Sequence, residues 1–169
     1  MEETSMITIR STVEKDAETL CALQKAAFFP IYELYHDDGN PCLRGIEDIA
    51  GRLHSPYFRY FTILDNDEIV GGIFYKCMGR TPFSDGLEKG EYYLQRIYIH
   101  PERQGRGIAR TAILLCEKEF PDATRFSVDF PKELEKNRRC YTHAGFQATG
   151  KELEAEPGLV LVSYEKVIG

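Results

Sequence analysis

Hydrophobic and polar residues alternate with a period of two in several short stretches, and this alternation predicts β-strands. The clearest pair, residues 57–64 and 69–75, flanks the turn Asp65-Asn66-Asp67-Glu68, as expected for a hairpin. Residues 92–99 form the strongest strand pattern, and Pro101 follows it closely. The complete set of predicted strands is 6–10, 57–64, 69–75, 92–99, 125–130, 146–153 and 159–166.

Between these strands, apolar residues recur at helical spacing and predict four helices. The first follows the capping-box pattern Ser11-Thr12-Val13-Glu14 and is expected to stop at Pro30. Residues 29–45 are then predicted to be irregular, with a short helix over 43–53. The third helix, 108–120, has an apolar stripe broad enough to pack against a sheet, and the fourth spans 134–144 before Gly145.

The predicted order β-α-α-β-β-β-α-β-α-β-β mixes hairpins with crossover helices. It indicates an α/β (α+β) sandwich around a mixed sheet. The 169 residues are expected to form a single domain over 1–169, because that length is typical of one compact unit.

Composition excludes several classes of protein. The chain has 21 basic and 27 acidic residues, a net charge of −6, which argues against a nonspecific nucleic-acid binder. No apolar run is long enough for a membrane span, and the acidic start does not resemble a signal peptide. Five cysteines without a C-x-x-C pair, and histidines without i,i+4 spacing, predict a cytoplasmic protein with reduced thiols and no metal site.

The residues after the 92–99 strand predict an anion site. There the chain passes through Gly105-Arg106-Gly107 directly into a helix, whose first N–H groups are unpaired and lie at the positive end of its dipole. Residues 100–111 contain three arginines and one glutamate, so this patch is positive in an acidic chain. A phosphate-rich ligand fits such a helix N-terminus, and a simple tight turn is the alternative.

Two common nucleotide motifs are not present at this turn. The P-loop pattern G-x-x-x-x-G-K-[ST] is absent, and Arg110 stands where the third glycine of G-x-G-x-x-G would lie. A nucleotide-binding protein of another fold is therefore disfavoured.

The segment Gln104-Gly105-Arg106-Gly107-Ile108-Ala109 resembles the Q/R-x-x-G-x-G/A signature of the GCN5-related N-acetyltransferases (GNAT). Asn137, Tyr141 and Gly145-Phe146 resemble a second signature of this family, and the element order is similar along nearly the whole chain. The resemblance implies a mixed, mostly antiparallel sheet of about seven strands with helices on both faces. It also implies that the central strands 92–99 and 125–130 splay apart.

The same resemblance implies acetyl-CoA as co-substrate and no metal. Its pantetheine arm would lie between the splayed strands and pair with main-chain groups of the 92–99 strand, while N–H groups of the glycine turn hold the pyrophosphate. The cofactor-binding residues implied in this way are Ile97, Tyr98, Ile99, Gln104, Gly105, Arg106, Gly107, Ile108, Ala109, Asn137 and Cys140.

Three residues are candidates for proton transfer. Tyr141 shares a helix face with Asn137, and the resemblance implies that its phenol protonates the departing CoA thiolate. A core aromatic is the alternative for Tyr141. Glu91 opens the central strand, and Tyr93 lies on the same strand face, so either could accept the proton of an amine, directly or through water. An exposed charge at a strand end is the alternative for Glu91, and the reaction could also proceed without a dedicated base.

Together these patterns predict an N-acetyltransferase that acts on a primary amine of a small molecule or peptide by direct attack in a ternary complex. The alternative is a non-catalytic acyl-CoA-binding module or sensor, which would not need Tyr141. Neither a nucleic-acid nor a membrane partner is expected, and a homodimer remains open. The resemblance implies that segments 29–45 and 79–90 lie over the acceptor opening, on the side opposite the pyrophosphate. Their aromatic and acidic residues would favour a cationic amine, and ordinary polar loop residues are the alternative. Their aromatic and acidic residues are Tyr32, Glu33, Tyr35, Asp37, Asp38, Asp85 and Glu88.

Overall fold

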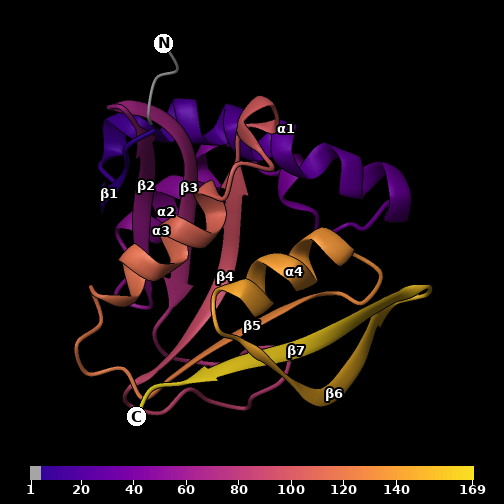
Figure 1. Cartoon of the computed structure of the whole chain (residues 1–169). Coiled ribbons are helices and arrows are strands. Elements are labelled where there is room, and N and C mark those ends of the chain that lie inside the picture. The colour runs from indigo at the N-terminus through magenta and orange to yellow at the C-terminus, as the bar shows by residue number, and fades with distance from the viewer. Residues whose placement is uncertain (1–4) are drawn as a thin grey trace.

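The computed structural model describes residues 5–169 and arranges them around a seven-stranded sheet (Figure 1). In spatial order the strands run β1-β2-β3-β4-β5-β7-β6. The strands are β1 (Ile7–Ser11), β2 (Phe58–Asp65), β3 (Glu68–Lys76), β4 (Glu91–Ile99), β5 (Arg125–Pro131), β6 (Gln147–Glu156) and β7 (Leu159–Val167). The α-helices are α1 (Ala17–Tyr35), α2 (Ile46–Leu53), α3 (Ile108–Glu117) and α4 (Glu135–His143).

One pair of neighbouring strands, β4 and β5, is parallel, and the other pairs are antiparallel. The parallel ladder is short, since only Glu91–Tyr93 pairs with Arg125–Ser127. Beyond these residues the two strands diverge, and Figure 1 shows the wedge between them. The predicted fold class, including the splayed central strands, is therefore confirmed.

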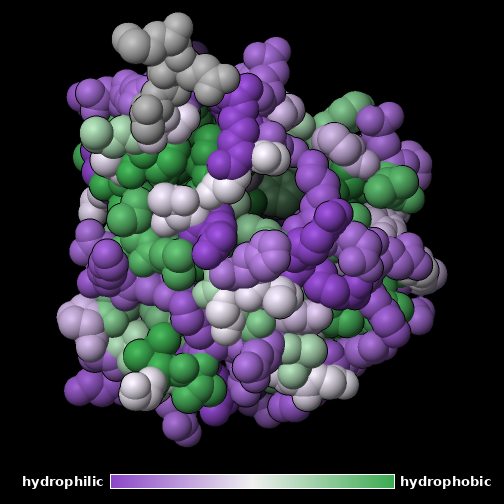
Figure 2. Space-filling view, in the orientation of Figure 1, coloured by the Kyte–Doolittle hydropathy of each residue, from purple (hydrophilic) through white to green (hydrophobic). Residues whose placement is uncertain are grey.

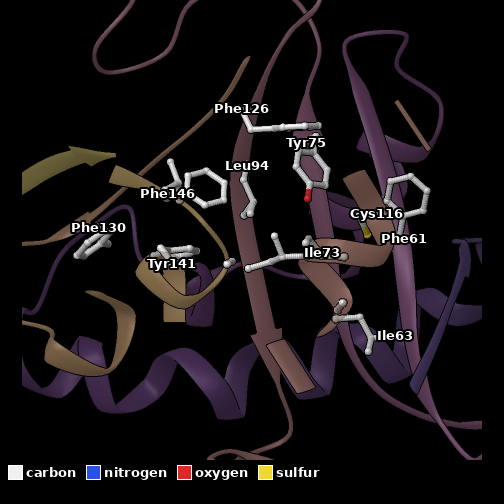
Figure 3. Packing of buried hydrophobic residues seen from close by; sticks show 14 of the residues in the cluster. Phe61, Ile63, Ile73, Tyr75, Leu94, Cys116, Phe126, Phe130, Tyr141 and Phe146 are labelled. Carbon is white, nitrogen blue, oxygen red and sulfur yellow. The ribbon is translucent and has the colours of Figure 1, made fainter. Parts of the chain in front are cut away.

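The two faces of the sheet have separate apolar cores. Leu20 of α1 and Ile49 of α2 pack with Phe74 on one face. Ala112 and Ile113 of α3 and Tyr141 of α4 belong to the larger core on the other face (Figure 3). Helices therefore cover both sides, as in a layered α/β sandwich. In residues 5–169, no helix is long and apolar enough to cross a membrane.

The prediction that Pro30 ends the first helix was wrong, because α1 continues to Tyr35. Proline removes the hydrogen bond to the carbonyl four residues earlier, here that of Ala26. Ala26 and Pro30 are both exposed, so water can solvate the released carbonyl and the helix continues. Residues 29–35 of the segment predicted to be irregular are thus helical.

The start of the first helix also differs from the predicted capping box. Ser11 belongs to β1, and a single 3₁₀ turn, Glu14–Asp16, precedes α1. The Asp16 carboxylate accepts the Val13 N–H at 3.0 Å and pairs with Arg10 at 2.6 Å. Asp16 therefore performs the role that the sequence pattern assigned to the Ser11–Glu14 box.

The remaining element boundaries differ by a few residues. A 3₁₀ turn, Pro41–Leu43, delays the second helix until Ile46, and α3 ends at Glu117 rather than at residue 120. The predicted β2–β3 hairpin is confirmed. Its two turn residues, Asn66 and Asp67, have φ angles of 50° and 68°, as a tight two-residue hairpin turn requires.

Two buried tyrosine hydroxyls should respond in opposite ways to removal. The Tyr75 hydroxyl lies in the core without a hydrogen-bond partner, whereas the hydroxyls of Tyr60 and Tyr98 bond each other at 2.5 Å. Tyr75→Phe should therefore raise the free energy of unfolding by about 1 kcal/mol, and Tyr98→Phe should lower it by about 1–3 kcal/mol. Urea unfolding of both variants measures this contrast, and a less stable Tyr75→Phe would contradict it.

Candidate active site

The wedge between β4 and β5 exposes one edge of β4. The His100 N–H donates to the Val70 carbonyl of β3 at 2.8 Å. Because main-chain groups of alternate residues point to the same neighbour, Tyr98 also faces β3, whereas Ile97 and Ile99 face the wedge. Of these three predicted cofactor-binding residues, Ile97 and Ile99 therefore have main-chain groups in position, and the Tyr98 phenol is buried beside Tyr60.

A β-bulge in β4 lies at the point where the strands separate. Leu94 pairs with Tyr75 and Arg96 with Phe74, so Gln95 is an extra residue without an opposite number in β3. A bulge bends its strand and increases the local twist. It therefore contributes to the divergence of β4 from β5, which begins just after Tyr93.

The glycine turn after β4 has the geometry of an anion site. Gly105 and Gly107 have φ angles of 80° and 76°, in the left-handed region that side chains disfavour. The Thr111 N–H donates to the Gly107 carbonyl at 3.1 Å, which is the first hydrogen bond of α3. The N–H groups of Ile108 and Ala109 therefore emerge from the helix N-terminus without an intrahelical acceptor.

The side chains around this turn divide into two groups. Arg103 is bound to Asp65 at 3.0 Å and to Glu68 at 2.6 Å, so its charge is neutralised within the protein. Gln104 donates its amide to the Ile99 carbonyl at 3.0 Å and closes the turn. Arg106 is exposed at the turn, and Arg110 lies in the first turn of α3. These two arginines are the cations available to a phosphate.

Tyr141 lies on α4 in the larger core, and its ring is only 6% exposed. Its ring centroid is 5.3 Å from that of Phe130 and 5.9 Å from that of Phe146 (Figure 3). Burial, with smaller effects of Cys140 and Asp129, raises the pKa of the Tyr141 phenol above its ordinary value. The phenol is therefore protonated at neutral pH, as a proton donor must be.

The other candidates on α4 lie near the start of α3. Asn137 and Cys140 are partly buried. Burial raises the pKa of the Cys140 thiol, and the charge of Arg110 partly opposes this effect. The first turn of α3 and the middle of α4 therefore face each other, which brings together the two motifs identified in the sequence.

Glu91 lies at the closed end of the wedge. One carboxylate oxygen accepts the Glu88 N–H at 2.9 Å, and the other is 3.7 Å from the Arg125 guanidinium. Residue 91 pairs with residue 125, where the strands are still joined. The role of proton acceptor stays a prediction for Glu91, and this location does not favour it.

Sequence reasoning missed a second carboxylate, Asp129, which lies on β5 just beyond the last paired residue. Tyr93 donates its hydroxyl to Asp129 Oδ2 at 2.7 Å. Burial raises the pKa of Asp129 to about 6, although the Tyr93 hydrogen bond acts in the opposite direction. The sequence contained one indication of this residue: an acidic residue stands between the apolar Val128 and Phe130, in a strand expected to border the cofactor.

The segments predicted to flank the acceptor lie in two different places. Tyr35, at the end of α1, lines a cavity of about 60 Å³ together with Glu133 and the β6–β7 turn, so α1 extends across the open end of the wedge. The 79–90 segment instead leads into the closed end, where Gly90 accepts the N–H groups of Thr124 and Arg125. Its position over the acceptor opening stays a prediction.

The surface of the molecule is hollowed beside this wedge. Figure 2 shows the hollow between the end of β4 and α4, with a mainly hydrophilic rim and a hydrophobic floor. Such a floor suits an aliphatic chain, and the rim suits polar groups at its two ends.

A model of one protein family, described as the acetyltransferase (GNAT) family, matches residues 18–146. No curated protein matches the chain. Solved structures do match it over almost its full length, among them structures of 13–20% sequence identity.

Three of these structures illustrate the similarity. The PaiA N-acetyltransferase of Thermoplasma acidophilum, in complex with coenzyme A, is 16% identical with a TM-score of 0.71, covering 96% of this chain and 99% of its own. AAC(6')-Ib, in complex with ribostamycin and coenzyme A, is 17% identical with a TM-score of 0.76, covering 95% and 93%. The ribosomal-protein-S18-alanine N-acetyltransferase of Escherichia coli is 13% identical with a TM-score of 0.71, covering 97% and 95%.

Proposed function

Because the chain belongs to the acetyltransferase (GNAT) family, we propose that it transfers the acetyl group of acetyl-CoA to a primary amine by direct attack in a ternary complex. The observation that carries this proposal is the wedge between β4 and β5, which opens beside the N-terminus of α3. An extended pantetheine arm needs main-chain partners, and a pyrophosphate needs N–H donors. The open edge of β4 offers the main-chain partners, and the adjacent N-terminus of α3 offers the N–H donors.

The cofactor would contact the chain mainly through the backbone. Ile97 offers its main-chain groups and Ile99 its N–H at the open edge of β4, since the Ile99 carbonyl already accepts the Gln104 amide. Ile108 and Ala109 offer N–H groups at the start of α3. The side chain of Ile108 is buried, so its part in binding is limited to the backbone. Arg106 and Arg110 supply positive charge at the helix end that already favours anions.

The chemistry needs one proton donor at the leaving sulfur. The amine attacks the thioester carbon, the C–S bond breaks, and Tyr141 gives its proton to the CoA thiolate. The raised pKa of this phenol keeps the proton available at neutral pH. The raised pKa of Cys140 also supports direct attack, since a protonated thiol is a poor nucleophile for a covalent acetyl intermediate.

The acceptor that fits best is a small cationic amine or a peptide amine. Asp37 and Glu133 both act on the pKa of Tyr35, which is raised chiefly by burial, so acidic groups gather at the α1 end of the wedge. Asp129 adds a further carboxylate inside the wedge. Carboxylates and aromatic faces both attract an ammonium group.

A comparison of acceptors tests this proposal. With acetyl-CoA saturating, kcat/KM should be about tenfold or more higher for a linear diamine than for an acidic amino acid, and raised salt should lower the diamine value. Release of free thiol measures both rates. A preference for the acidic acceptor, or a diamine rate that does not change with salt, would contradict the predicted acceptor class.

A further inference from the structure

Asp129 is partly buried, and within residues 5–169 it has no cationic partner at hydrogen-bond distance. Four other partly or fully buried carboxylates have a cation at hydrogen-bond distance: Asp16 has Arg10, Asp48 has Arg52 and Arg96, Asp65 has Arg103, and Glu117 has Lys166. In residues 5–169, the hydrogen-bond partner of the Asp129 carboxylate is the neutral Tyr93 phenol, which occupies Oδ2. Removing a carboxylate from water is costly unless a cation accompanies it, so the partial burial of Asp129 favours a cationic group at this site.

Asp129 lies where the wedge between β4 and β5 begins. Tyr93 is the last β4 residue that pairs with β5, and Asp129 lies two residues beyond its partner Ser127. Their hydrogen bond of 2.7 Å therefore joins the strands at the point where they separate. Within residues 5–169, the second carboxylate oxygen, Oδ1, accepts no hydrogen bond and is not fully buried.

Asp129 and Tyr141 approach this vertex from opposite faces of the sheet. Val128 and Phe130 belong to the core that contains Tyr141. Since side chains alternate along a strand, Asp129 points to the other face, which α1 covers. The charge of Asp129 nevertheless contributes to the raised pKa of Tyr141.

We infer that Asp129 is the catalytic base that takes the proton from the acceptor's ammonium group and that Tyr93 is its positioning residue. This inference rests on the proposed function. The ammonium group gives one proton to Asp129, which passes it to solvent, and the free nitrogen pair then forms the bond to the thioester carbon. When the C–S bond breaks, its electron pair leaves on sulfur and takes the proton of Tyr141. The second proton of the nitrogen restores the tyrosine.

The pH dependence of the reaction follows from the groups around Asp129. Burial raises the pKa of Asp129 to about 6, and the hydrogen bond from Tyr93 of β4 lowers it. The charge of Asp129 in turn raises the pKa of Tyr93 and that of Tyr141 on α4. Arg96 of β4 acts in turn on Tyr93. Both tyrosines have raised pKa values, so neither ionises in the same range. For a strongly basic amine, kcat/KM should therefore rise with pH to a plateau, with its midpoint near 6.

The direct test is Asp129→Asn. It should lower kcat/KM by about 10²–10⁴-fold at neutral pH and remove the plateau, so that the remaining rate follows the neutral fraction of the amine. The CoA dissociation constant, measured by calorimetry, should be unchanged. The variant should also fold, because a carboxyl pKa raised by burial means that the ionised form opposes folding above that pKa.

Asp122→Asn is a matched control. Asp122 accepts the Tyr92 hydroxyl at 2.6 Å, so it forms the same type of pair with the same strand, but at the exposed, closed end of the wedge. Its replacement should leave kcat/KM and the pH profile unchanged. Tyr93→Phe should raise the midpoint of the profile, because the Tyr93 hydrogen bond lowers the pKa of Asp129.

Two results would overturn the inference. One is an Asp129→Asn enzyme that keeps the wild-type plateau and rate, and the other is a larger loss in Glu91→Gln than in Asp129→Asn. Either can occur while the wild-type enzyme still acetylates amines, so the proposed function would stand. A wild-type protein that acetylates no amine would instead refute the proposed function itself.

Discussion

Tyr141→Phe is expected to lower kcat by about 10²–10⁴-fold while CoA affinity stays close to the wild-type value. The ring packs between Phe130 and Phe146, and phenylalanine preserves those contacts. The hydroxyl alone is lost, and with it the proton that the CoA thiolate receives. Steady-state kinetics across pH, together with calorimetry of CoA, separates these two effects.

Tyr75→Phe is the matched control for this variant. Both tyrosines belong to the same core and have raised pKa values, but the Tyr75 hydroxyl is buried without a partner. Tyr75→Phe should therefore leave kcat unchanged. If the rates of Tyr141→Phe matched the wild type across pH, Tyr141 would be a packing residue only.

Gly107→Val is expected to weaken CoA binding by about 10- to 100-fold. Gly107 has a φ angle of 76°, a conformation that a β-branched residue strongly disfavours, and nothing lies within 4 Å of the position of an added Cβ. The effect would therefore come from the changed backbone, which moves the N–H donors at the start of α3. A hydrogen bond to a charged group contributes about 1.5–3 kcal/mol, so the loss of one such bond gives this range.

Gly150→Val serves as the control for backbone strain. Gly150 has a φ angle of 88° and equally open surroundings, but it lies in the exposed strand β6. Both variants should lose similar stability on thermal unfolding, and only Gly107→Val should bind CoA more weakly by calorimetry. Unchanged affinity in Gly107→Val would exclude the turn as a pyrophosphate site.

Most of the fold could be predicted because alternation and helical spacing are local properties of the chain. The hairpin at residues 65–68 is an example, since its turn residues favour a left-handed backbone. The extent of α1 was not predictable in the same way. Whether Pro30 ends a helix depends on whether water reaches the carbonyl of Ala26, and the local pattern does not contain this information.

The parts of the candidate site that are local in sequence were likewise predictable, and the parts that join distant residues were not. The glycine turn and the Asn137–Tyr141 face are continuous in sequence and were recognised there. The Tyr93–Asp129 pair joins residues 36 positions apart on two strands, so no local motif contains it. For Arg103 the sequence is misleading. Its place in the glycine turn suggests that its side chain binds phosphate, whereas in the structure its charge is neutralised by Asp65 and Glu68, which lie far away in sequence in the β2–β3 hairpin.

The most direct test of the account measures thiol release and product masses in the same reaction. The protein is incubated with acetyl-CoA, with and without a diamine. The account predicts one acetylated amine for each thiol released, no acetylated protein, and no thiol release above background without the amine. Tight binding of acetyl-CoA with no amine-dependent thiol release would contradict the account and indicate a non-catalytic acyl-CoA-binding module.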